Sequence, residues 1–163
     1  MKRIISIILL ITILGCLTSC TSDENLEEIL YYIEVDMAEF AEIEQKLNTS
    51  YNSMASSDTI SDRDAYKQFM TTTMNLAIKL NDKATKLSYS IKNPELAEVH
   101  EICVEYTTVI LSALSIMTSA VENSDFDLIE EGNIKIKEAE NLADEYSAAL
   151  ENLVKKYGLE LEK

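Results

Sequence analysis

Few residues in this 163-residue sequence are of the types that carry out catalysis or bind transition metals. His100 is the only histidine, and Glu98 and Glu101 lie close to it in the chain. A zinc site or a histidine-activated nucleophile needs further groups, and no local motif supplies them. The helical periodicity around Tyr106 turns His100 away from the apolar face, so we predict a solvated surface histidine. We also predict no catalytic residue, no metal site and no cofactor.

The three cysteines occupy different surroundings. Cys16 and Cys20 lie in the first 20 residues, whereas Cys103 stands in an apolar segment without a nearby partner. We predict that Cys103 is a small buried hydrophobic residue rather than a reactive thiol or half of a disulfide. A covalent role for Cys20 depends on the residues that precede it.

The N-terminus has the order of features found in an export signal. Lys2 and Arg3 precede an apolar run over residues 4–14, and small residues follow it. The run is shorter than the roughly 20 apolar residues of a membrane-spanning helix. We therefore predict a signal peptide.

Leu17, Thr18, Ser19 and Cys20 follow this run, and together they resemble the lipobox of bacterial lipoproteins. The resemblance covers only about the first 20 residues. It implies that residues 1–19 are removed, that Cys20 carries lipid, and that residues 20–163 lie on the extracytoplasmic face of the cell membrane. Cys16 is a weaker alternative for the lipid site. The resemblance implies no activity.

The net charge of −15, from 29 acidic and 14 basic residues, limits the possible partners. Such a charge repels nucleic acid, and the basic patches that bind phosphate are missing. It also repels anionic lipid headgroups. We therefore expect no nucleic-acid partner, and a body that stands off the membrane on its anchor.

Three glycines and one proline in the whole chain favour long helices over an all-β fold. Apolar residues recur at spacings of three and four, which predicts amphipathic helices. The small polar residues of 48–58 predict a loop. The four predicted helices cover residues of about 23–47, 61–92, 94–123 and 125–157.

None of these helices can bury its apolar face alone. Short connections make sequential helices antiparallel neighbours, so the pattern predicts an all-α, antiparallel up-down-up-down four-helix bundle after the N-terminal signal segment. A helical array completed by another chain is the alternative. Residues 102–121 of the third segment contain a single charge, Glu105, but the serines and threonines there and the amphipathic neighbouring segments argue against a membrane span.

Two sets of residues are candidate sites. Core tyrosines whose hydroxyls need partners could line a small cavity between the helices, and these are Tyr66, Tyr106 and Tyr146. An uncharged strip on the third helix is a candidate partner face, because interface centres are depleted in charge; it consists of Val104, Thr108, Leu111, Ser115 and Ser119.

The sequence thus predicts a membrane-anchored lipoprotein with a non-catalytic helical module for interaction or structure in the cell envelope. Its expected partners are the membrane, through the N-terminal lipid, and an envelope protein or a second copy of the chain. The alternative is a bundle that binds or senses a small ligand or a cation. No nucleophile or acid/base pair stands out, so we do not expect an enzyme.

Overall fold

The computed structural model describes residues 24–55 and 61–159, so the predicted signal peptide and Cys20 lie outside the described residues. Within these ranges the chain forms helices joined by turns and contains no strand, which confirms the all-α prediction. There are four helical stretches, two of which contain a π-helical segment. In order, the elements are α1 (Glu24–Tyr31), η1 (Tyr32–Asp36, π-helical), α2 (Met37–Ala55), α3 (Asp62–Gln68), η2 (Phe69–Thr73, π-helical), α4 (Met74–Ser88), α5 (Pro94–Asn123) and α6 (Phe126–Lys156).

The first helical stretch is longer than predicted. It continues to Ala55, so the prediction of a loop beginning at residue 48 was wrong. Asn48 and Ser50 are buried, and the Ser50 hydroxyl lies 2.8 Å from that of Thr73 in η2. These tertiary contacts outweigh the low helix propensity of the local sequence.

The second stretch ends earlier than predicted, at Ser88 instead of near residue 92. The Glu28 carboxylate accepts hydrogen bonds from the backbone N–H groups of Lys92, at 2.6 Å, and Asn93, at 3.0 Å. Pro94 also disfavours helical geometry in the residue before it. The connection to α5 is therefore held by α1 rather than by continued helix.

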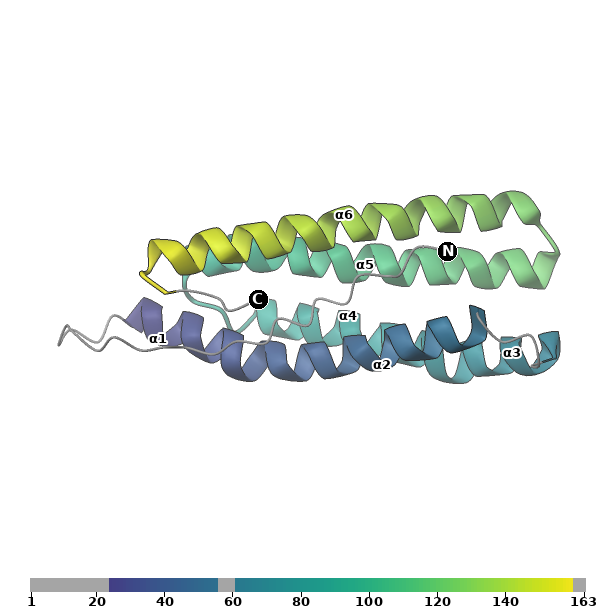
Figure 1. Cartoon of the computed structure of the whole chain (residues 1–163), viewed down its shortest axis with the longest axis horizontal. Helices are drawn as coiled ribbons and strands as arrows, with labels where there is room; N and C mark the ends of the chain where they lie inside the picture. Colours follow the sequence, from purple (N-terminus) through teal and green to yellow (C-terminus); the bar gives the residue numbers. More distant parts are fainter. Residues whose placement is uncertain (1–23, 56–60, 160–163) are drawn as a thin grey trace.

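The helices run along one long axis (Figure 1). α5 and α6 pack against each other and are joined by the short turn at Ser124 and Asp125. On the other side of the molecule α2 packs against α4, and α4 in turn packs against α5.

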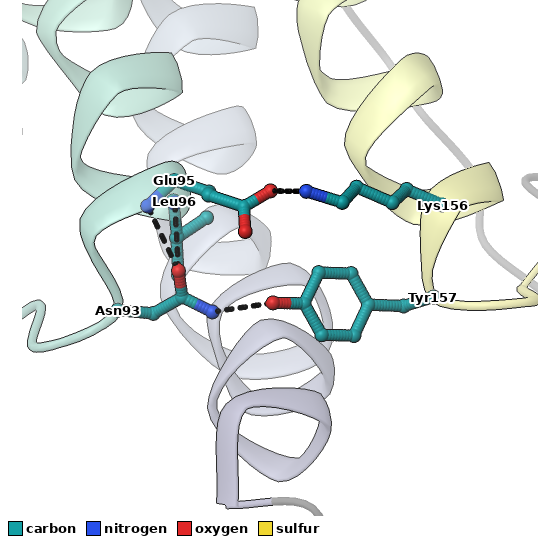
Figure 2. Close-up of polar contacts among 5 residues, drawn as sticks. All are labelled: Asn93, Glu95, Leu96, Lys156 and Tyr157. Carbon is teal, nitrogen blue, oxygen red and sulfur yellow. Dashed lines mark hydrogen bonds and ion pairs between the residues drawn. The ribbon is translucent and has the colours of Figure 1, made fainter.

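Polar contacts tie the start of α5 to the end of α6 (Figure 2). The Asn93 side chain caps α5 by accepting from the N–H groups of Glu95, at 2.9 Å, and Leu96, at 3.1 Å. Lys156 forms an ion pair with Glu95, and the Asn93 amide donates to the Tyr157 hydroxyl at 3.4 Å. With Glu28 at the same connection, α1, the start of α5 and the end of α6 share one end of the molecule.

α5 is long and apolar enough to cross a membrane, judged by length and composition alone. The core helix of a protein that stays in water passes the same test. In this structure α5 packs between α4 and α6 and buries eleven of its side chains. Many of the apolar side chains of α5 are thus buried against the neighbouring helices.

Candidate functional site

A group of buried polar side chains joins η1 to α5 and α6 by hydrogen bonds. η1 supplies Tyr32, which is buried, while its neighbour Tyr31 is 59 % exposed. Ile33, the next residue, is also buried, so two adjacent side chains of η1 face the interior. π-helical segments occur often at functional sites, which makes this cluster the first place to look for chemistry.

A continuous chain of hydrogen bonds passes through the Tyr32 hydroxyl. The hydroxyl oxygen lies 2.8 Å from His100 Nδ1 and 2.9 Å from the Tyr146 hydroxyl, and His100 Nε2 lies 2.8 Å from the carbonyl oxygen of Ala84. A carbonyl only accepts, so Nε2 carries the proton. His100 Nδ1 then accepts from Tyr32, and Tyr32 accepts from Tyr146. One proton arrangement therefore satisfies the whole chain, and His100 is neutral in it.

The prediction of a solvated His100 was wrong, because the side chain is 0 % exposed. α5 contacts α4 on one side and α6 on another, so its buried arc is wider than the single stripe around Tyr106. A second stripe was present in the sequence at spacings of four and three. It consists of Leu96, His100, Cys103, Thr107, Ile110 and Leu114, all of which are buried.

Burial also sets the protonation of the cluster. It lowers the pKa of His100, although the hydrogen bond to Ala84 and the Asp36 carboxylate act in the opposite direction. Burial raises the pKa of Tyr32 and Tyr146. These groups are therefore uncharged at neutral pH, which agrees with the proton arrangement given above.

Cys103 is buried next to this cluster, which confirms the predicted burial of that residue, and its thiol is free within the described residues. Burial raises the pKa of the Cys103 thiol, and the nearby Glu44 carboxylate adds to this effect. A buried neutral thiol is a poor nucleophile, so the geometry gives Cys103 a packing role.

Glu44 and Tyr106 form a second buried polar pair. The Tyr106 hydroxyl donates to Glu44 Oε1 at 2.5 Å, and the Glu44 side chain is 0 % exposed. Burial raises the pKa of Tyr106, and Glu44 raises it further. The sequence analysis missed Glu44, although its position four residues after Phe40 and three before Leu47 places it on the apolar stripe.

The structure separates the three tyrosines predicted to line a cavity. Tyr106 borders a cavity of about 20 Å³, together with Tyr51, Asn48 and apolar side chains of α5 and α6. Tyr146 belongs to the hydrogen-bond chain of Tyr32. Tyr66 donates to Glu122 at 2.6 Å, sixteen residues from Tyr106 along α5 and hence about 24 Å away.

The five residues of the predicted partner face are only partly available. Val104 and Leu111 are partly buried and pack against the core. The Asn81 amide donates to the Thr108 hydroxyl at 2.9 Å. Ser115 is exposed, while Ser119 is half-buried, and both donate to carbonyls of their own helix. The hydroxyls of this strip are therefore satisfied without a partner.

The hydrogen-bond chain joins four helical stretches, and its groups are paired with one another rather than directed at a cleft. Residues 24–55 and 61–159 contain no group of three or more His, Cys, Asp or Glu side chains that could hold a metal ion. Comparisons with family models, with curated proteins and with solved structures found no match for this chain. The chemistry visible here is that of a structural polar cluster.

Replacing Tyr32 by Phe is expected to destabilise the protein. The change removes the hydroxyl that pairs with both His100 and Tyr146, so two buried polar groups lose a partner. We expect the free energy of unfolding to fall by about 1–3 kcal/mol, measured by urea denaturation. Tyr31→Phe is the matched control on the exposed neighbour, with an expected change within about 0.5 kcal/mol. Equal effects of the two changes would show that the Tyr32 hydroxyl does not hold the core.

Acidification is expected to destabilise the fold through His100. Because burial lowers the pKa of His100 in the folded state, the unfolded chain takes up the proton first as the pH falls through about 6.5. The free energy of unfolding should then decrease until the pH drops below the pKa of the folded state. Burial raises the pKa of Asp36, so protonation of that residue stabilises the fold at lower pH and opposes the effect.

Denaturation of the wild type and His100→Gln over a series of pH values separates the two contributions. The decrease that begins near pH 6.5 should be present in the wild type and lost in the variant, whatever the variant's absolute stability. The same pH dependence in both proteins would assign the effect to other groups.

Proposed function

We propose that this protein is a lipid-anchored lipoprotein of the bacterial cell envelope, on the extracytoplasmic face of the cell membrane. Residues 20–163 would form a non-catalytic helical module that acts in interaction or structure. The observation that carries the proposal is the order of basic residues, apolar run and lipobox-like tetrapeptide ending at Cys20. Only residues 21–23 separate that cysteine from the start of α1 at Glu24.

We further propose that the module is an antiparallel up-down-up-down bundle, as the sequence pattern predicts. The pairing of residues across helices supports this topology. Between α2 and the second stretch, Glu39 pairs with Lys83 and Ser50 with Thr73, so residue numbers rise on one side and fall on the other. Between α4 and α5, the Asn81 amide donates to the Thr107 hydroxyl, and the Ala84 carbonyl accepts from His100. The short turn between α5 and α6 fits the same arrangement.

The closed core supports a non-catalytic role. The hydroxyl and imidazole groups of the cluster around Tyr32 are buried and bonded to each other, and Cys103 is a buried thiol. The cavity beside Tyr106, at about 20 Å³, has room for about one water molecule. It therefore gives no support to a small-ligand site.

Labelling cells with a clickable palmitate analogue tests the anchor. Wild type and Cys16→Ser are expected to incorporate the label and to fractionate with membranes, while Cys20→Ser is expected to lose all label. Because an uncleaved apolar leader can itself retain a protein on membranes, the label rather than fractionation decides the outcome. Loss of label in Cys16→Ser alone would move the lipid to that residue, and labelling of neither wild type nor variants would refute the lipoprotein proposal.

The uncharged strip of Val104, Thr108, Leu111, Ser115 and Ser119 is the face that we propose for contact with a second copy or an envelope protein. Its lack of charge is unusual on a protein with a net charge of −15. Such depletion is typical of interface centres. Leu111 packs partly into the core, so a test of the face must use an exposed member, and Ser115 is suitable.

Ser115→Glu is expected to weaken self-association through this face. A carboxylate buried in an interface without a partner loses its hydration, so the dissociation constant of the mature, unlipidated chain should rise about tenfold or more, corresponding to about 1.4 kcal/mol. Sedimentation equilibrium provides the measurement. Asn141→Glu, on the exposed side of α6, is the matched control and should leave association unchanged. A wild type that stays monomeric would exclude self-association through the strip.

A further inference from the structure

Exposed large apolar side chains on the described surface lie in two main groups, one near the start of α1 and one around the turn between α5 and α6, where Val121, Phe126, Ile129 and Ile134 are exposed. Tyr31 in α1 is 59 % exposed, Val35 in η1 is 47 % exposed, and Tyr89, directly after α4, is 85 % exposed. We call Tyr31, Val35 and Tyr89 the tyrosine patch. Burial of the neighbouring Tyr32 in the core fixes the outward position of Tyr31.

Two contacts show that the segments that carry these residues are neighbours. Glu28 accepts from the backbone N–H of Lys92 at 2.6 Å, and Glu39 accepts from Lys83 Nζ at 2.5 Å. Glu28 and Glu39 enclose Tyr31 and Val35 in the sequence, while Lys83 and Lys92 enclose Tyr89. The two segments therefore lie along each other between the two contacts, and each of them carries exposed members of the patch.

The patch lies near Cys20, the residue that would carry the lipid. The inference about the membrane therefore rests on the lipid anchor proposed above. The three residues between Cys20 and Glu24 span at most about 14 Å when fully extended. Tyr31 and Val35 follow within less than about 20 Å of helix. A lipid inserted in the bilayer thus holds the patch within reach of the headgroup region.

We propose that the tyrosine patch rests on the lipid–water interface of the membrane that holds the anchor. The partner of the patch is then a bilayer of zwitterionic lipids. Tyrosine is enriched at membrane interfaces because its ring is apolar and its hydroxyl stays hydrated. Lys92 follows Tyr89 closely in the sequence and can extend its ammonium group toward phosphate, while the ammonium of Lys86 is paired with Asp82 at 2.6 Å.

The tether explains how so small a patch can hold the surface. Two tyrosines and a valine bind a bilayer weakly when the protein is free in solution. Attachment through the N-terminus makes the contact intramolecular, which raises its strength by a factor on the order of 100 or more. The protein then lies against the bilayer, in contrast to the body standing off on its anchor that the net charge predicted.

The absence of tryptophan from the sequence allows a direct test. Tyr89→Trp places a single reporter in the patch, and Phe126→Trp places one at the start of α6, where Phe126 is 82 % exposed at the opposite end of the molecule. The mature chain is coupled through Cys20 to a maleimide lipid in phosphatidylcholine vesicles. The buried Cys103 thiol does not compete. This chemical attachment makes the test independent of lipidation in the cell.

On vesicles with brominated acyl chains, Tyr89→Trp should lose emission and shift it to shorter wavelength, while Phe126→Trp should keep the spectrum of the free protein. Adding Tyr31→Ser to Tyr89→Trp should restore much of the emission, and adding Val121→Ser should not. Circular dichroism checks that each variant is folded.

Three results would overturn the proposal: no quenching of Tyr89→Trp on coupled vesicles, equal quenching of both reporters, or a concentration-dependent blue shift of Tyr89→Trp without vesicles. The last result would identify a second copy as the occupant of the patch. Failure of palmitate labelling at Cys20 is a separate outcome, since it refutes the native anchor and leaves the measurement on coupled vesicles unchanged.

Discussion

The buried hydroxyl of Tyr32 is the group on which the arrangement of helices depends most directly. It accepts one hydrogen bond from Tyr146 and donates one to His100, which in turn donates to the carbonyl of Ala84. Four helical stretches thereby meet at three hydrogen bonds. A buried polar group without a partner costs about 1–3 kcal/mol, so a rotation or shift of any one helix breaks the chain at a measurable cost. An entirely apolar core would tolerate such shifts more easily.

The polar contacts along the interior form several levels rather than one site. The chain around Tyr32 occupies the level near the start of α1, and the Glu44–Tyr106 pair lies further along the long axis of the molecule. Beyond it, Ser50 meets Thr73, which η2 places in the core. Each level pairs side chains from different helices, so each fixes the register of its neighbours. Apolar burial supplies most of the driving force for folding, and the polar pairs select one packing among many.

The all-α class could be predicted from the sequence because the features that favour helices act between residues close together in the chain. Scarce glycine and proline, and apolar residues three and four apart, act within single helices. The errors arose where tertiary contacts decide. Residues 48–55 are poor helix formers, yet contacts such as Ser50 with Thr73 keep them helical. The end of the second stretch depends on Glu28, which lies 64 residues from the N–H group of Lys92 that it binds.

The dependence on tertiary contacts also explains why the buried cluster of Tyr32, His100 and Tyr146 was not predicted. A polar residue on an apolar stripe was interpreted as lying outside the stripe, although His100 falls between Leu96 and Cys103 in a regular four–three pattern. The pattern could have identified His100 and Glu44 as buried. It could not have identified their partners, because Tyr32 and Tyr146 are 114 residues apart and meet only through the packing of η1 against α6. The π-helical segments also leave no mark in a search for a period of 3.6 residues.

Because the polar groups of the core are bonded to one another, contacts with other molecules must be sought on the surface. The hydrogen-bonding groups around Tyr32 are used inside the fold, so they are not available to bind a partner without loss of stability. The exposed surface differs between its regions: the tyrosine patch lies near the start of α1, the uncharged strip runs along α5, and Phe126 and Val121 are exposed where α5 turns into α6. An anchor at Cys20 would hold the first region near the lipid and leave the α5–α6 turn at the far end. Since the net charge keeps the rest of the protein well hydrated, these uncharged regions are where contact with another surface requires the least desolvation.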